Sequence, residues 1–267
     1  MPTESQQITY SPDSSAIPEK IARVPPQSPK LPTLVRTTAL MSPDTHASQI
    51  TAESGKLGQS EYALQSALSA QRQMTEQVAA LEQVRNTRSP SDTAQQHFKK
   101  AGDAYQRILR SAASRYDASR SNIQGRLAQI EGQISQALGL HDTKDATEIR
   151  QALRTMSKED RSAAVLTAIK QKDGAVLGAV FSGREITTGI PDTQRDSFRR
   201  RAEQAHAPEL LQLRVGLEKA NQLVSDAFDN LVEMESQVVG APEVKSEFER
   251  QIEASDKAWF EFDAAMQ

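Results

Sequence analysis

The sequence predicts an all-α protein of long antiparallel coiled-coil helices, with a small helical head and an extended, proline-rich N-terminal arm. Hydrophobic residues make up 37% of the 267 residues and aromatic residues only 4%, whereas a globular domain has roughly 45–50% hydrophobic residues. After residue 56, hydrophobic residues recur at heptad spacing over long stretches without proline. We therefore expect thin hydrophobic stripes buried between helices and no thick central core.

Residues 1–56 are predicted to form an extended or disordered arm rich in Pro, Ser and Thr. Eight of the twelve prolines lie here, and each one removes a backbone donor and fixes φ, which disfavours both helix and central strand. Two interpretations remain open: a tail without fixed structure, or an arm that docks along a partner surface. In the second, the contacts would come from Leu31, Leu34, Val35, Leu40 and Met41.

Two long helices are predicted within residues 57–139. The first, over 57–85, has Gln71 at one a position, where a polar residue can fix the register. The second, over 90–138, would be capped by Ser89 with Pro90 at its first position, and its glycines mark bends or close helix contacts. The apolar a and d residues of the first helix are Leu57, Leu64, Ala67, Met74, Val78 and Leu81.

Residues 140–207 are predicted to form a small helical head, and residues 208–267 to return as helices antiparallel to 90–138. The head is divided by turns near 173–174, 182–183 and 189–192. Residues 61–139 carry ten basic and seven acidic side chains, whereas residues 201–267 carry six basic and fourteen acidic ones. This opposite charge favours pairing of the two halves across flanking e and g positions.

The sequence carries no motif of a catalytic, cofactor or metal site. There is no cysteine, and none of the four histidines has a second histidine three or four residues away. No Walker, dinucleotide-binding or nucleophile-elbow motif occurs. We therefore expect no enzymatic activity, no cofactor and no small-molecule substrate. No apolar run approaches the roughly 18 residues of a membrane span, and residues 1–30 lack the apolar segment of a Sec signal peptide.

Two residue clusters are candidate interaction sites. Trp259, Phe260 and Phe262 lie within four residues, and they either close the base of the helix bundle or form a docking site. Arg195, Arg199, Arg200 and Arg201 either contact phosphate or form a solvated face that pairs with the acidic C-terminal helix. Since only Phe198 interrupts this basic cluster, stacking on nucleic-acid bases is not expected.

A family resemblance covers about a third of the chain, residues 142–224. Here short helices, the run KDGAVLGAVFSG, a turn, a basic helix and the run HAPELLQLRVGLEKANQLV follow one another. This order resembles an uncharacterised protein found among tailed-bacteriophage structural genes. The resemblance implies a virion component or assembly factor, found in the virion or in the host cytoplasm during assembly. It would bind copies of itself and other virion proteins; no functional residue can be carried over.

Two other functions remain open. The Ser/Thr/Pro-rich N-terminus resembles a type III secretion signal, so the chain could be a secreted effector or translocator-like protein that leaves the cell without a signal peptide. The basic cluster would instead suit a scaffold associated with nucleic acid, whose binding would depend strongly on salt. The net charge of -3 argues against nucleic-acid coating by the whole chain.

Overall fold

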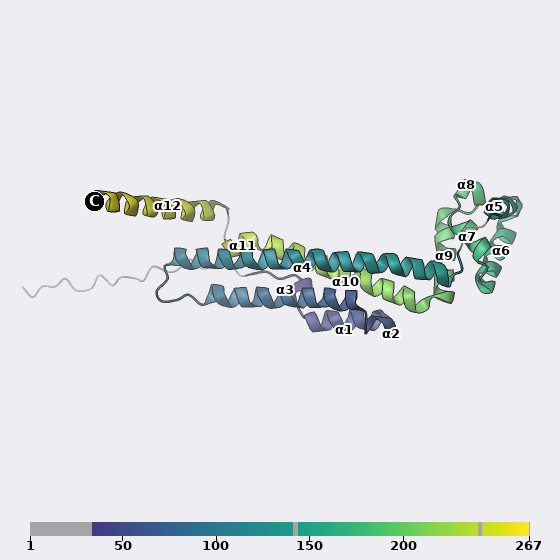
Figure 1. Ribbon diagram of the computed structural model, residues 1–267, viewed down its shortest axis with the longest axis horizontal. Helices are drawn as coiled ribbons and strands as arrows, with labels where there is room; N and C mark the ends of the chain where they lie inside the picture. The colour runs from purple at the N-terminus through teal and green to yellow at the C-terminus, as the bar shows by residue number, and fades with distance from the viewer. Residues whose placement is uncertain (1–33, 141–143, 240–241, 267) are drawn as a thin grey trace, which may run out of the picture. The chain divides into compact units, whose positions relative to one another are not determined.

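A computed structural model describes residues 34–140, 144–239 and 242–266 (Figure 1). The prediction of an all-α chain is confirmed, because this part of the chain forms helices and no strand. Residues 1–33, which include Leu31, lie outside the described residues. The elements are η1 (Thr38–Leu40), α1 (Pro43–Glu53), α2 (Gly55–Gly58), α3 (Tyr62–Asn86), α4 (Ala94–Ala137), α5 (Ala146–Thr155), α6 (Lys158–Gln171), α7 (Gly174–Phe181), α8 (Glu185–Thr188), α9 (Asp192–His206), α10 (Pro208–Glu233), α11 (Glu235–Val239) and α12 (Pro242–Ala265).

Part of the predicted extended arm is helical, which corrects its C-terminal boundary. Pro43 occupies the first turn of α1, where the missing backbone N–H has no intrahelical partner to lose. The helix is followed by Ser54, which is fully buried where the chain crosses α10. A Cβ atom added to Gly216 of α10 would lie 1.8 Å from Ser54 Oγ and 3.1 Å from Ser54 Cα. Only glycine therefore fits at this crossing.

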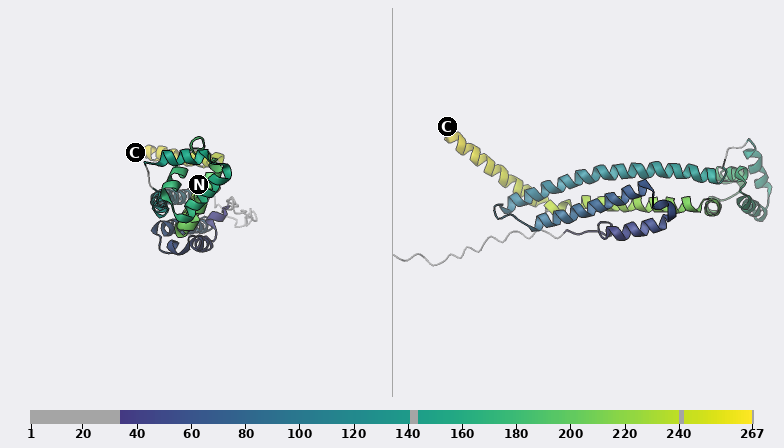
Figure 2. Two further views of the ribbon diagram at one scale, coloured as in Figure 1. Left: turned by 90° about the vertical axis from the view of Figure 1, so that its right-hand side faces the viewer. Right: turned by 60° about the horizontal axis from the view of Figure 1, so that its bottom comes forward.

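Helices α3, α4 and α10 pack against one another and bury most of the hydrophobic core (Figure 2). Of the predicted a and d residues in α3, Leu64, Ala67, Met74, Val78 and Leu81 are buried. Leu57 precedes α3 in α2 and is exposed. These contacts follow the heptad spacing because one stripe of each helix faces its neighbours.

Polar contacts between these helices show which parts of them lie side by side. Tyr105 of α4 is buried and donates a hydrogen bond of 2.8 Å to the carbonyl of Leu231, near the end of α10. Further along α4, Glu131 pairs with Arg214, near the start of α10. Burial, together with the nearby charge of Glu235, raises the pKa of Tyr105 to about 12.

The start of α4 differs from the prediction. Its N-cap is Thr93, whose hydroxyl accepts a hydrogen bond from the backbone N–H of Gln96, and the side chain of Gln96 accepts one from Thr93 N. This reciprocal pair satisfies two unpaired donors at once. The predicted start was therefore four residues too early.

Helices α5 to α9 pack mainly on one another, through contacts of α5 with α7 and α8 and of α6 with α7 and α9. Ser157 caps α6, and Asp173 caps α7 by accepting hydrogen bonds from Ala175 N and Val176 N. Gly174 lies so close to the turn after α4 that an added Cβ would be 1.8 Å from the carbonyl oxygen of Gly139. The returning helices over 208–239 are α10 and α11, which are divided at Met234. Among the helices described, none combines the length and hydropathy needed to cross a membrane.

Candidate interaction surfaces

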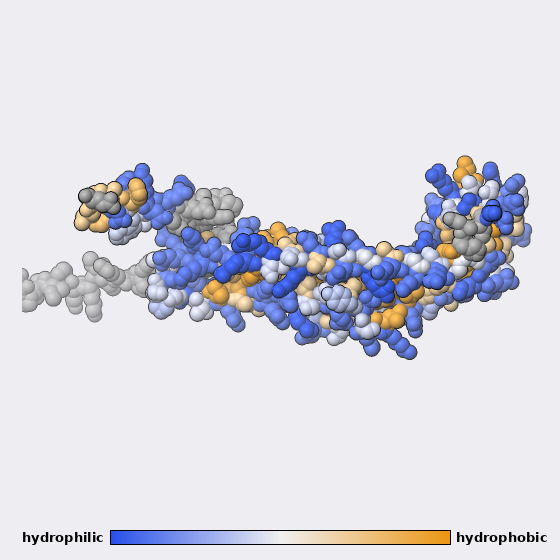
Figure 3. Space-filling model, viewed as in Figure 1, coloured by the Kyte–Doolittle hydropathy of each residue, from blue (hydrophilic) through white to orange (hydrophobic). Residues whose placement is uncertain are grey.

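The most exposed hydrophobic cluster lies at the end of α12. Trp259, Phe260, Phe262 and Met266 are 65%, 75%, 54% and 73% exposed. Trp259 and Phe262 meet edge to face, with ring centroids 5.8 Å apart. Figure 3 shows hydrophobic side chains on the surface at this end of α12. We name these four residues the aromatic patch. Its rings are open to solvent in the single chain.

Residues 34–41 bind along the chain's own helices. Val35 N donates to Gln237 Oε1 over 2.7 Å, and Thr37 N donates to Asn230 Oδ1 over 3.0 Å. Gln71 Nε2 donates to the carbonyl of Ala39 over 2.6 Å, so the polar a residue of α3 holds this segment.

The predicted arm contacts are divided between the core and the surface. Leu34 and Leu40 are buried in the chain's own core, whereas Val35 and Met41 are exposed. The contacts of the two leucines seen in the structure are therefore intramolecular, and Val35 and Met41 are the two that remain open to a partner. Leu31 lies outside the described residues.

The arginine cluster is only partly available to phosphate. Arg195 donates to the carbonyl of Gly183 and pairs with Asp192, both over 2.8 Å. Arg199 pairs with carboxylates of α4 and α9, whereas Arg200 and Arg201 are exposed. The ion pairs of Arg195 and Arg199 are thus made with α4 and α9, and contact with nucleic acid stays a prediction.

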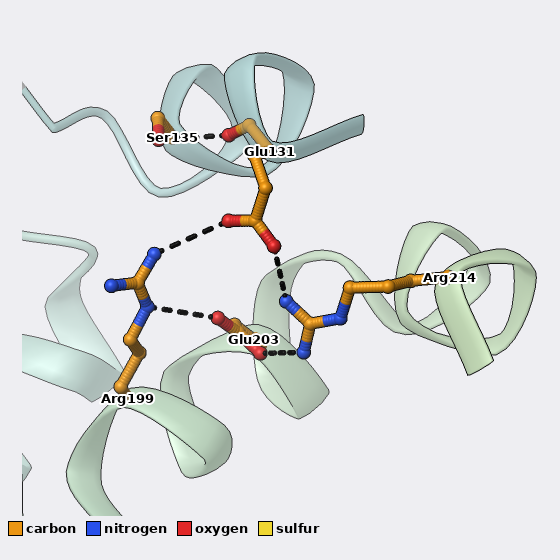
Figure 4. A network of polar contacts seen from close by, with 5 residues as sticks. All are labelled: Glu131, Ser135, Arg199, Glu203 and Arg214. Carbon is orange, nitrogen blue, oxygen red and sulfur yellow. Dashed lines mark hydrogen bonds and ion pairs between the residues drawn. The ribbon is translucent and has the colours of Figure 1, made fainter. Parts of the chain in front are cut away.

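Arg199 belongs to a network that connects α4, α9 and α10 (Figure 4). Glu203, only 2% exposed, pairs with Arg199 over 3.1 Å and with Arg214 over 2.6 Å. Glu131 pairs with the same two arginines over 3.3 Å and 2.8 Å, and its carbonyl accepts from Ser135. Burial lowers the pKa of Arg214, but hydrogen bonds to both carboxylates outweigh this and raise it. Each carboxylate of the network pairs with both arginines, so the network joins the three helices.

The side of α4 turned away from α3 and α10 is both basic and rich in small side chains. Its exposed basic residues are Lys99, Lys100, Arg107 and Arg110, and Asp103 and Asp117 are exposed among them. Arg115 and Arg120 are exposed on the two flanks of this side. Its exposed small residues are Ser114, Ala118, Ser121, Gly125, Ala128 and Gly132, in steps of four and three. We name these two sets together the outer face of α4. A Cβ added to Gly125 or Gly132 would have no neighbour within 4 Å, so packing within the chain does not require these glycines.

A surface hollow of about 290 Å³ lies where the outer face of α4 meets the start of α3. Ser121 and Gly125 line it from α4, and Glu61 and Tyr62 line it from the start of α3. Arg126 at its wall pairs with Glu61 over 2.8 Å. Tyr62 is 74% exposed, so the hollow has an apolar ring at its rim and a glycine in its wall.

The described histidines make structural contacts to backbone. His46, His97 and His206 each bond through Nε2 to a carbonyl oxygen, those of Thr38, Arg85 and Ile169. In the described ranges, no group of three or more His, Asp or Glu residues is arranged to hold a metal ion. His141 lies outside those ranges.

Comparison with known proteins gives no family assignment. No family model matches the chain, and no curated protein and no solved structure matches it.

Proposed function

We propose that this chain is a structural or assembly protein of a tailed-bacteriophage particle, which binds copies of itself and other virion proteins and performs no catalysis. The observation that carries the proposal is the aromatic patch on α12. The resemblance of residues 142–224 to a protein found among phage structural genes is the reason that we propose a phage particle as the place of this interaction.

The physical argument concerns hydrophobic surface. Burying one large apolar side chain is worth about 1.5–3 kcal/mol relative to leaving it in water. Three aromatic rings and a methionine within eight residues are exposed at the end of α12, although the stripes of α3, α4 and α10 are buried. Trp is among the residues that contribute most at protein interfaces, and aromatic side chains in general are enriched there. A partner that covers the aromatic patch would recover this free energy.

An antiparallel coiled-coil arrangement of the long helices is part of the same proposal. The contacts of Tyr105 with Leu231 and of Glu131 with Arg214 support it, because positions that rise along α4 lie beside positions that fall along α10. Residues 1–33 would then extend from this bundle as an arm along a neighbouring molecule. Such an arm would place Leu31, Val35 and Met41 at the contact.

The proposal is tested on particles purified by density gradient from cells that carry the gene. We expect the chain to migrate with the particles in a fixed ratio to the major capsid protein, measured by quantitative mass spectrometry. The double substitution Trp259→Ala and Phe262→Ala is expected to remove it from the particles. Ile186→Ala, which truncates a residue 73% exposed on α8, is the matched control and should leave incorporation unchanged.

Two results would refute this function. One is full particle yield and infectivity without the gene, with the chain absent from wild-type particles. The other is appearance of the chain in the culture medium that depends on residues 1–30 and on a type III secretion apparatus, which would favour the secreted effector instead.

A further inference from the structure

We infer that α12 of one chain docks on the outer face of α4 of a second copy, so that two chains exchange their C-terminal helices. This rests on the self-association within the proposed function and names the two surfaces that make it. Both surfaces are exposed in the single chain, and both belong to the same sequence.

The first surface is an amphipathic helix with an acidic character. Trp259, Phe262 and Met266 follow one another at steps of three and four, which places them on one face of α12. Over its full length α12 contains seven acidic and three basic residues. Asp256 and Asp263 lie beside the apolar face, because both are within about a quarter of a helical turn of it. The helix therefore offers large apolar side chains bordered by negative charge.

The second surface has the complementary properties. Between residues 99 and 120, α4 carries six basic and two acidic residues. Four of the basic residues and both acidic ones lie on its outer face, and Arg115 and Arg120 lie on its flanks. The small residues then continue the same helical face to Gly132, at steps that keep them on one line. Small side chains let a second helix approach closely, and exposed glycine in a helix costs about 1 kcal/mol relative to alanine. Gly125 and Gly132 have no packing role within the chain that would offset this cost.

The two surfaces match in size as well as in charge. α12 has 24 residues and a length of about 36 Å, whereas positions 99–132 of α4 extend for about 50 Å. Arg107 and Arg110 make side-chain hydrogen bonds only to backbone carbonyls of their own helix, so their charges are available to Asp256 and Asp263.

The occupant is a second copy because each chain carries both surfaces of the contact. A reciprocal exchange covers both aromatic patches and both outer faces in one closed dimer with two-fold symmetry. A neutral partner would leave both surfaces without counter-charges, and a partner of one sign would supply counter-charges to only one of them.

Light scattering after size exclusion tests the mass of the full-length chain. At low ionic strength we expect the mass of a dimer. The double substitution Trp259→Ala and Phe262→Ala should raise the dissociation constant of this dimer at least about 100-fold. Arg107→Glu with Arg110→Glu should have a similar effect, and Lys257→Glu on the opposite side of α12 is the control. A 1:1 mixture of the aromatic and arginine variants should regain a mass of two chains, because one intact contact remains between them.

The absence of cysteine allows a direct test of which chain is contacted. Chains with Ala118→Cys and differently tagged chains with Ala265→Cys are mixed and treated with a short bismaleimide. We expect a cross-linked product that contains both tags, and none when Ala118→Cys is replaced by Ala163→Cys on α6.

Several results would overturn the exchange. They are a monomer at every concentration, a dimer unaffected by either double substitution, and a cross-link confined to one chain that carries both cysteines. Binding of duplex DNA to the outer face of a monomeric chain would overturn it too. If the helix exchange is absent but the chain is still incorporated into phage particles, the proposed function stands. If the chain is also absent from the particles, the proposed function is refuted as well.

Discussion

Replacing Glu203 with Gln tests whether the network of Figure 4 holds α9 and α10 together. The substitution keeps the size of the side chain and removes its charge. Glu203 is 2% exposed and pairs with Arg199 and Arg214. Loss of one member of a buried ion pair costs about 3–5 kcal/mol. Since Arg199 is 42% exposed and can regain water, we expect a loss of about 2–3 kcal/mol in the free energy of unfolding.

Urea unfolding followed by circular dichroism measures this change. The slope of the free energy with urea should stay the same, and the midpoint should fall. Asp44→Asn is the matched control, because it removes a carboxylate that pairs with Arg72 over 2.6 Å at the surface, where the side chains are 85% and 51% exposed. That change should cost less than about 1 kcal/mol.

The dependence on salt concentration also distinguishes the buried ion pairs of Glu203 from the exposed ion pair of Asp44. The effect of Glu203→Gln should persist in about 1 M salt, whereas that of Asp44→Asn should vanish, because exposed pairs are screened far more than buried ones. Equal losses for the two substitutions, or a loss below about 0.5 kcal/mol for Glu203→Gln, would refute the role assigned to the network.

Three further predictions concern the helices around α4. Tyr105→Phe should lower the free energy of unfolding by about 1–2 kcal/mol, because the carbonyl of Leu231 loses its donor. The pKa of Tyr105 is raised in the folded chain to about 12 from 10.0, so wild type should lose stability as pH rises across this interval, and calorimetry should show a smaller loss for the variant. Gly216→Ala should cost about 1–3 kcal/mol through overpacking, and Ser54→Gly should relieve most of it in a double-mutant cycle. Gly125→Ala should raise thermal stability by about 1 kcal/mol, since its Cβ meets no neighbour; a loss would show that the glycine is needed within the chain.

The candidate surfaces were partly predictable from the sequence. The sequence identifies Trp259, Phe260 and Phe262 as a candidate interaction site because aromatic residues are rare in this chain. Their exposure was not predictable, since the same rings could have closed the bundle. The outer face of α4 was missed, although the regular spacing of its serine, alanine and glycine residues was visible. Small residues occur on both buried and exposed faces of a helix, so their exposure cannot be predicted until the opposite face is known to be buried.

Local rules of the chain determined the helices. Heptad spacing specified the buried positions of α3 because residues three and four apart share a helix face, and Ser157 marked the start of α6 because its hydroxyl caps a nearby N–H. Tertiary structure alone decided which of these faces found partners. It placed residues 34–41 against α3 and α10, enclosed Glu203 between two arginines, and left the aromatic patch in solvent. Those outcomes depend on contacts between residues far apart in the chain, whose free energies no local spacing encodes.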